Sequence, residues 1–174
     1  MLFRSWTHLK WNPFLYLGVP DGDEYWTDTT KKAMVVVGDK GVLAPGVVGY
    51  DGGRRGCIVL SYHAYLTDLV FRDGAELQVA LHDDGTSSYV DLTETSSAGS
   101  YIDVTLAGTI SVATTKKVPM GVKYPVIKYQ QGKLTGRFAN VTQGFKVQYD
   151  VLQPDGAYAV TVERKNVGTF IIIR

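Results

Sequence analysis

The chain has 174 residues, with 18 Lys or Arg residues against 17 Asp or Glu residues, so its net charge is +1. A chain of this length forms one domain whose core is large enough to be stable without disulfides or a structural metal. The near-neutral charge excludes a strong overall field for nucleic acids, although it leaves a local basic patch open. The single cysteine, Cys57, cannot form an internal disulfide and is expected to be a buried thiol.

Residues 1–32 differ from the rest of the chain. They contain all three tryptophans, and neither helical nor strand periodicity persists in them. We expect an extended arm or irregular cap here, whose large aromatic side chains are buried either against the protein's own core or against a partner. Residues 33–174 are expected to form a single β-sandwich domain, with 157–174 as a potential C-terminal extension. No basic lead and apolar stretch of a signal peptide is recognisable at the start, which favours synthesis in the cytoplasm.

From residue 33 onward, apolar and polar residues alternate with a period of two. In 75–82, for example, Leu77, Val79 and Leu81 share one face of a predicted strand. The segment 61–72 also fits a helical spacing, but we expect a strand that ends near His63 and then a loop. Turn pairs such as Asp73-Gly74 separate the predicted strands. Strands are expected at 33–38, 56–63, 75–82, 87–93, 102–107, 110–114, 122–129, 134–141, 145–152, 158–163 and 167–173.

Strands with one polar face are typical of antiparallel sheets, and many short strands with frequent turns are typical of sandwiches and barrels. We therefore expect an all-β protein, an antiparallel β-sandwich of the jelly-roll type with an extended N-terminal arm. The sequence shows no recognisable internal repeat and no low-complexity tract. No segment approaches the ~20 apolar residues of a membrane helix, so no membrane partner is expected.

A search for reactive groups yields little. The segment His82-Asp83-Asp84 could supply metal ligands, but Asp83 to Thr86 is better explained as a hairpin turn after a strand. The glycine-rich segment around Arg54 and Arg55 lacks the spacing of a phosphate-binding loop and is expected to be a basic loop that could touch an acidic partner. We expect no catalytic residue, no cofactor and no metal, and hence no enzyme. A hydrolase stays open as a residual alternative, since the distance between two carboxylates is a property of the fold.

The central pattern resembles a known family. An alternating Leu-x-Val-x-Leu strand ends in the acidic turn at 82–85, and the segment Pro119-Met120-Gly121-Val122-Lys123-Tyr124 leads into another strand. The segment Leu134-Thr135-Gly136-Arg137 then opens a strand of small residues. Over about residues 40–153 this is similar to the cement, or decoration, proteins of tailed-bacteriophage capsids, whereas the arm and residues 157–174 lie outside the match.

The resemblance implies a jelly-roll sandwich on the outer surface of an icosahedral phage head, where it bridges neighbouring capsomers and stabilises them. The implied partner is the major capsid protein. Further copies of the chain are also expected, with a homodimer favoured over a trimer, and the near-neutral charge argues against direct contact with nucleic acid. Weak contacts suffice on a lattice because avidity multiplies them. Large aromatic side chains and arginines are typical interface anchors. The candidate partner-binding residues are Trp6, Trp11, Phe14, Tyr16, Trp26, Arg54 and Arg55.

Two alternatives remain. A carbohydrate-binding β-sandwich module would use tryptophan and tyrosine side chains to stack against sugars. Another virion part, in the tail, collar or baseplate, would share the all-β composition.

Overall fold

The computed structural model describes residues 15–18, 33–45, 56–59, 66–93, 101–114 and 118–166. Within these ranges every regular element is a strand, which confirms the predicted all-β class, and no helix there is long and apolar enough to cross a membrane. In chain order the strands are β1 (Leu15–Gly18), β2 (Ala33–Val37), β3 (Val42–Leu43), β4 (Cys57–Val59), β5 (Leu66–Phe71), β6 (Glu76–Leu81), β7 (Tyr89–Asp91), β8 (Asp103–Leu106), β9 (Thr109–Thr114), β10 (Lys123–Tyr129), β11 (Leu134–Gly136), β12 (Asn140–Val141), β13 (Phe145–Leu152) and β14 (Tyr158–Arg164).

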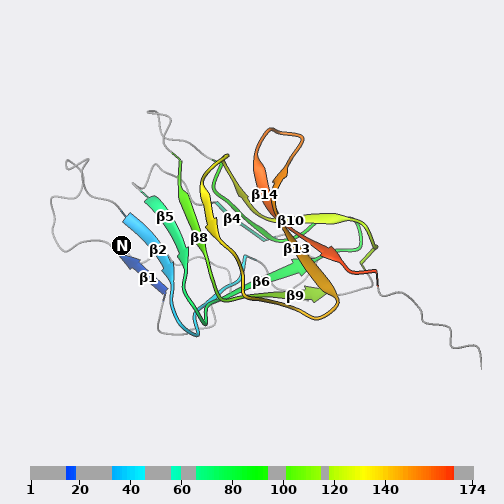
Figure 1. Ribbon diagram of the computed structural model, residues 1–174, viewed down its shortest axis with the longest axis horizontal. Coiled ribbons are helices and arrows are strands. Elements are labelled where there is room, and N and C mark those ends of the chain that lie inside the picture. The colour runs from blue at the N-terminus through cyan, green and yellow to red at the C-terminus, as the bar shows by residue number, and fades with distance from the viewer. Residues whose placement is uncertain are drawn as a thin grey trace, which may run out of the picture.

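The described strands form three sheets that the chain visits in turn. Sheet A has the order β1-β2-β5-β8-β11, sheet B the order β12-β9-β6-β3, and sheet C the order β13-β14-β10-β7-β4. One circuit, here called a rung, thus comprises β2, β3 and β4, and the next two rungs comprise β5 to β7 and β8 to β10. A fourth rung begins with β11 and β12. Figure 1 shows β2, β5 and β8 side by side, with β6 and β9 in a second layer. This winding is that of a parallel β-solenoid.

Equivalent residues of successive rungs stack into apolar columns inside the solenoid. In sheet A, Val35, Leu69, Val104 and Leu134 are register partners from one strand to the next. Their spacing of about 30 to 35 residues corrects the expectation that the chain holds no repeat, and it lies in the range of solenoid proteins. Similar columns line the other two sheets, formed by Leu43, Leu77, Ile110 and Val141 in sheet B and by Ile58, Val90, Ile127 and Val160 in sheet C.

The expected antiparallel pairing is wrong for most of the described strands. Neighbouring strands of successive rungs pair in parallel, and antiparallel pairing among the described strands is limited to β1–β2, β10–β14 and β13–β14. A rung has a core on its inner face and water on its outer face, so its strands show the same alternation as half-buried antiparallel strands. The period of two therefore located the strands without revealing their direction. A jelly-roll sandwich is not confirmed.

The antiparallel strands lie at the two ends of the stack. Strand β1 covers the outer edge of β2 in the first rung, with Tyr16 opposite Val36. Strand β14 takes the fourth-rung position in sheet C beside β10, and β13 pairs with its far side. Solenoids need such caps because an uncovered sheet edge invites pairing with other chains.

The corner between sheets A and B requires glycine. Gly108 has a φ of 74°, and a Cβ atom at this position would overlap the backbone carbonyl oxygen of Ala75 in the rung below. The same carbonyl accepts a hydrogen bond of 2.8 Å from the backbone N–H of Thr109. The backbones of the second and third rungs are thus in direct contact at this corner.

Most predicted strands are present within the described residues, with three differences. Residues 66–71, expected to be a loop, form β5, and the predicted strand 134–141 is divided into β11 and β12 by a corner at 137–139. Two further strands were not predicted, β1 within the segment that was expected to be an arm or irregular cap, and the short strand β3. The expected turn at Asp83 to Thr86 is confirmed, since the Thr86 N–H donates to the Asp84 carboxylate at 3.0 Å and the His82 N–H donates to the Thr86 carbonyl at 2.9 Å. The predicted strand 167–173 lies outside the described residues.

Candidate interaction surface on sheet C

The outer face of sheet C gathers polar side chains from two neighbouring rungs. Val90 and Ile127 are fully buried register partners that point into the core. Because side chains alternate along a strand, Tyr89 and Asp91 on β7 and Lys128 on β10 lie on the opposite face. Asp91 and Lys128 are themselves register partners, so the parallel stacking places an acidic and a basic residue on neighbouring strands of this face.

Lys128 is the centre of this group. Its Nζ atom lies 3.0 Å from Oδ2 of Asp155, in the turn between β13 and β14, and 5.6 Å from the ring centroid of Tyr89. The hydrogen bond from Lys128 holds the pKa of the Asp155 carboxyl below its ordinary value. The Lys128 side chain keeps 22% of its surface exposed and Asp155 keeps 53%, so both groups can be reached by a partner.

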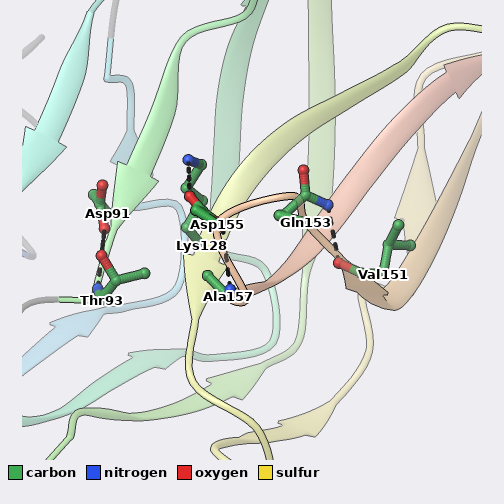
Figure 2. Close-up of polar contacts among 7 residues, drawn as sticks. All are labelled: Asp91, Thr93, Lys128, Val151, Gln153, Asp155 and Ala157. Carbon is green, nitrogen blue, oxygen red and sulfur yellow. Dashed lines mark hydrogen bonds and ion pairs between the residues drawn. The ribbon is translucent and has the colours of Figure 1, made fainter.

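Neighbouring contacts fix the surrounding side chains (Figure 2). Oδ1 of Asp91 accepts hydrogen bonds from the Thr93 backbone N–H at 3.0 Å and from the Thr93 hydroxyl at 2.6 Å. In the turn, Oδ1 of Asp155 accepts a bond from the Ala157 N–H at 3.1 Å, and the Gln153 side chain donates to the Val151 carbonyl at 2.9 Å. We call the group of Tyr89, Asp91, Thr93, Lys128 and Asp155 the Lys128 cluster.

A second set of contacts anchors the hairpin that carries Asp155. The Tyr129 hydroxyl donates to the Asp150 carboxylate at 2.8 Å and accepts from the Asp150 backbone N–H at 2.9 Å, across the intervening strand β14. Asp150 lies at a β-bulge of β13 and has a φ of 55°, which is uncommon for a residue with a side chain. Burial is the largest cause that raises the pKa of Tyr129, and the hydrogen bond to the Asp150 carboxylate is the second. The bulge is therefore held in place from the core side.

Such an arrangement suits recognition by charge, hydrogen bonding and stacking. The side chains of the Lys128 cluster are held by their neighbours, so little side-chain entropy is lost when a partner binds. Within the described residues, no group of three or more His, Cys, Asp or Glu side chains is placed to hold a metal ion.

The residues singled out from the sequence fall mostly outside this region. Trp6, Trp11, Phe14, Trp26, Arg54 and Arg55 lie outside the described residues, so their predicted role stays a prediction. Tyr16 lies on β1 at the far edge of sheet A, in register with Val36. The described residues thus offer a different surface from the one that the aromatic arm suggested.

The sequence carries little signal for the Lys128 cluster. Lys128 lies within the predicted strand 122–129 and Asp155 is followed by Gly156, a pair typical of turns, but nothing in their spacing predicts that Lys128 and Asp155 meet. Asp91 comes beside Lys128 only because β7 and β10 stack in adjacent rungs. A repeat of about 33 residues, recognised beforehand, would have indicated this neighbourhood.

No protein-family model matches the chain, and no curated protein sequence is similar to it.

Proposed function

We propose that the chain is a structural virion protein, a cement protein that binds the outer surface of an icosahedral phage capsid and bridges neighbouring capsomers. The resemblance of residues 40–153 to decoration proteins motivates this proposal. The observation that supports it best is the Lys128 cluster, a surface of fixed polar side chains on the outer face of a stacked sheet. The proposed partners are the major capsid protein and further copies of the chain.

The role needs a stiff body with broad polar faces more than it needs a particular strand order. Stacked rungs supply stiffness because each strand is hydrogen-bonded along its length to its neighbours. Contacts that are individually weak become sufficient when many copies bind to one lattice. The proposal therefore does not depend on the jelly-roll order that the resemblance implied.

A binding experiment with capsids that lack the protein tests this function. The purified chain, mixed with such capsids, is expected to co-sediment at a fixed stoichiometry and to raise the temperature at which the capsids open. Failure to co-sediment with the capsid of the virus that encodes the chain would contradict the proposal.

Two variants test whether the Lys128 cluster is the surface involved. Lys128→Ala removes the ammonium group that pairs with Asp155 and lies over Tyr89. Lys165→Ala, just beyond the opposite end of β14, removes an exposed lysine of the same charge. We expect at least a tenfold weaker capsid affinity for the first variant, equivalent to about 1.4 kcal/mol, and little change for the second. Equal effects in both would assign binding to another surface.

A carbohydrate-binding module is the second candidate, favoured by the half-buried Tyr89 ring beside the Lys128 ammonium and the Asp91 carboxylate. Aromatic rings next to polar groups suit sugar stacking and hydrogen bonding. A glycan array distinguishes the two functions: binding that is lost in Tyr89→Ala favours the module, and an array without signal eliminates it. A role in the tail, collar or baseplate is tested by the position of the protein in the virion.

A further inference from the structure

The outer face of sheet C carries a second charged region besides the Lys128 cluster. Lys123 on β10, Glu163 on β14 and Lys146 on β13 are register partners and form one row across three neighbouring strands. The next residues along two of these strands, Tyr124 and Val162, are fully buried, so the row itself faces outward. Two lysines against one glutamate leave this row positive, whereas two aspartates against one lysine leave the Lys128 cluster negative.

One cation of the row can bind a partner without breaking an ion pair. The Lys146 ammonium lies 3.2 Å from the Glu163 carboxylate, which is only 14% exposed and also accepts a hydrogen bond of 3.1 Å from Gln148. The charge of Glu163 is thus satisfied within its own chain. Lys123 is exposed, and among the described residues no acidic side chain forms an ion pair with it.

An exposed methionine lies close to Lys123. Met120, 58% exposed, is in the turn that leads into β10, three residues before Lys123. The turn is fixed at its base, because Val118 is buried and its carbonyl accepts a hydrogen bond of 3.1 Å from Arg164 at the end of β14. A fixed apolar side chain beside an unpaired cation suits a protein surface that carries carboxylates around an apolar patch. We call Met120, Lys123 and Lys146 the Lys123 end.

The Lys123 end and the Lys128 cluster are two separate contacts on one face. Lys128 is the register partner of Ala159, and Lys123 is that of Glu163. Ala159 and Glu163 are four residues apart on β14, so roughly 13 Å separates the two regions along the strand. Because the regions carry opposite charge, a partner surface with one sign of charge cannot match both. Two different patches of partner surface are therefore required.

We propose that the Lys128 cluster contacts one capsomer while the Lys123 end contacts an acidic patch of the neighbouring capsomer, so that the outer face of sheet C lies across the boundary between them. The inference rests on the proposed function and specifies how the chain bridges capsomers. A bound protein stabilises a closed shell only if it binds the closed shell better than the opened one. The contact of the Lys128 cluster persists when neighbouring capsomers separate, whereas the contact of the Lys123 end is lost. The rise in the opening temperature of the capsid therefore comes from the Lys123 end.

The test removes the Lys123 end from the full chain. Met120→Ser together with Lys123→Gln removes the exposed methionine and the unpaired ammonium, and leaves the ion pair between Lys146 and Glu163 intact. The matched control, Met34→Ser together with Arg72→Gln, removes an exposed methionine from β2 and an exposed cation from the turn after β5. Circular dichroism first establishes that each variant is folded. Each chain is then mixed at saturating concentration with capsids that lack the protein, and co-sedimentation and opening temperature are measured.

The two readouts separate binding from bridging. We expect the variant of the Lys123 end to co-sediment at the stoichiometry of the unmodified chain but to leave the opening temperature at the value of capsids without the protein. The control should retain both the stoichiometry and the rise in temperature.

Two outcomes would overturn the inference while leaving the proposed function standing. In the first, the variant of the Lys123 end raises the opening temperature as much as the unmodified chain does. In the second, this variant no longer co-sediments, because binding would then depend on the Lys123 end alone. Failure of the unmodified chain to co-sediment contradicts the proposed function, and the inference with it.

Discussion

Substitution of Gly108 by alanine tests the close stacking of rungs at the corner between sheets A and B. Gly108 and Gly132 have almost the same backbone φ angle, 74° and 75°. A Cβ atom at Gly108 would overlap the Ala75 carbonyl oxygen, whereas a Cβ atom at Gly132 has no other atom within 4 Å. Gly132→Ala is therefore a control that carries the same backbone strain without the steric overlap.

The two costs can be compared. A residue with a side chain in the left-handed region loses about 1 to 2 kcal/mol, and this applies to both variants. At Gly108 the overlap also displaces the Ala75 carbonyl, which weakens its hydrogen bond to Thr109 by about 1 kcal/mol. Overpacking of a well-filled site adds about 1 to 3 kcal/mol. We expect total losses of about 3 to 6 kcal/mol for Gly108→Ala and about 1 to 2 kcal/mol for Gly132→Ala.

Calorimetric unfolding measures the difference directly. In a chain of this size, 1 kcal/mol corresponds to about 2 to 4 °C in melting temperature. Gly132→Ala should therefore melt about 2 to 8 °C below the unmodified protein, and Gly108→Ala should melt well below Gly132→Ala. Equal melting temperatures for the two variants would refute the backbone approach between the second and third rungs.

Three further predictions concern the core and the ionisable groups. Leu77→Ala, at a fully buried column position, should lower the free energy of unfolding by about 3 to 5 kcal/mol, whereas Leu152→Ala, 63% exposed, should change it by less than about 0.5 kcal/mol in denaturant titrations. The raised pKa of Tyr129 means that the folded state favours the neutral phenol, so stability should fall as the pH rises above 10. Tyr129→Phe should cost about 1 to 2 kcal/mol at pH 7 and reduce that fall, and an unchanged slope would contradict this role. The lowered pKa of Asp155 means that its ion pair with Lys128 stabilises the fold above pH 3.8 and that this contribution is lost as the pH falls below 3.8. Because the pair is solvent-exposed, Asp155→Asn should lower the free energy of unfolding by less than about 1 kcal/mol. An effect of this substitution that persists in 1 M salt would contradict the ion pair.

The sequence located most strands because the alternation of Leu77, Val79 and Leu81 reflects a direct physical contrast between core and water. The same contrast exists in a solenoid rung and in an antiparallel sheet, so it could not determine strand direction. Direction depends on which strands pair, and here β6 pairs with β3 and β9, which belong to other rungs. The repeat escaped recognition because rungs differ in length and stacked residues such as Leu69 and Val104 share only their apolar character.

The candidate site was less predictable than the fold. The turn at Asp155 could be expected from its Asp-Gly pair, but its partner Lys128 belongs to another strand of sheet C. Strand β5 was missed because the apolar residues Leu66, Leu69 and Val70 also fit a helix, and only pairing with β2 and β8 determines its conformation. Strand β5 and the contact between Lys128 and Asp155 both depend on pairing between residues far apart in the sequence, which local sequence patterns do not encode.

The proposed virion role can be checked by cryo-electron microscopy of the phage particle to which the proposal assigns the chain. We expect density for the solenoid on the outer surface of the head, at a repeated position between neighbouring capsomers and with the Lys128 cluster facing the capsid. Density confined to the tail, collar or baseplate, or absence of the protein from the particle, would contradict it.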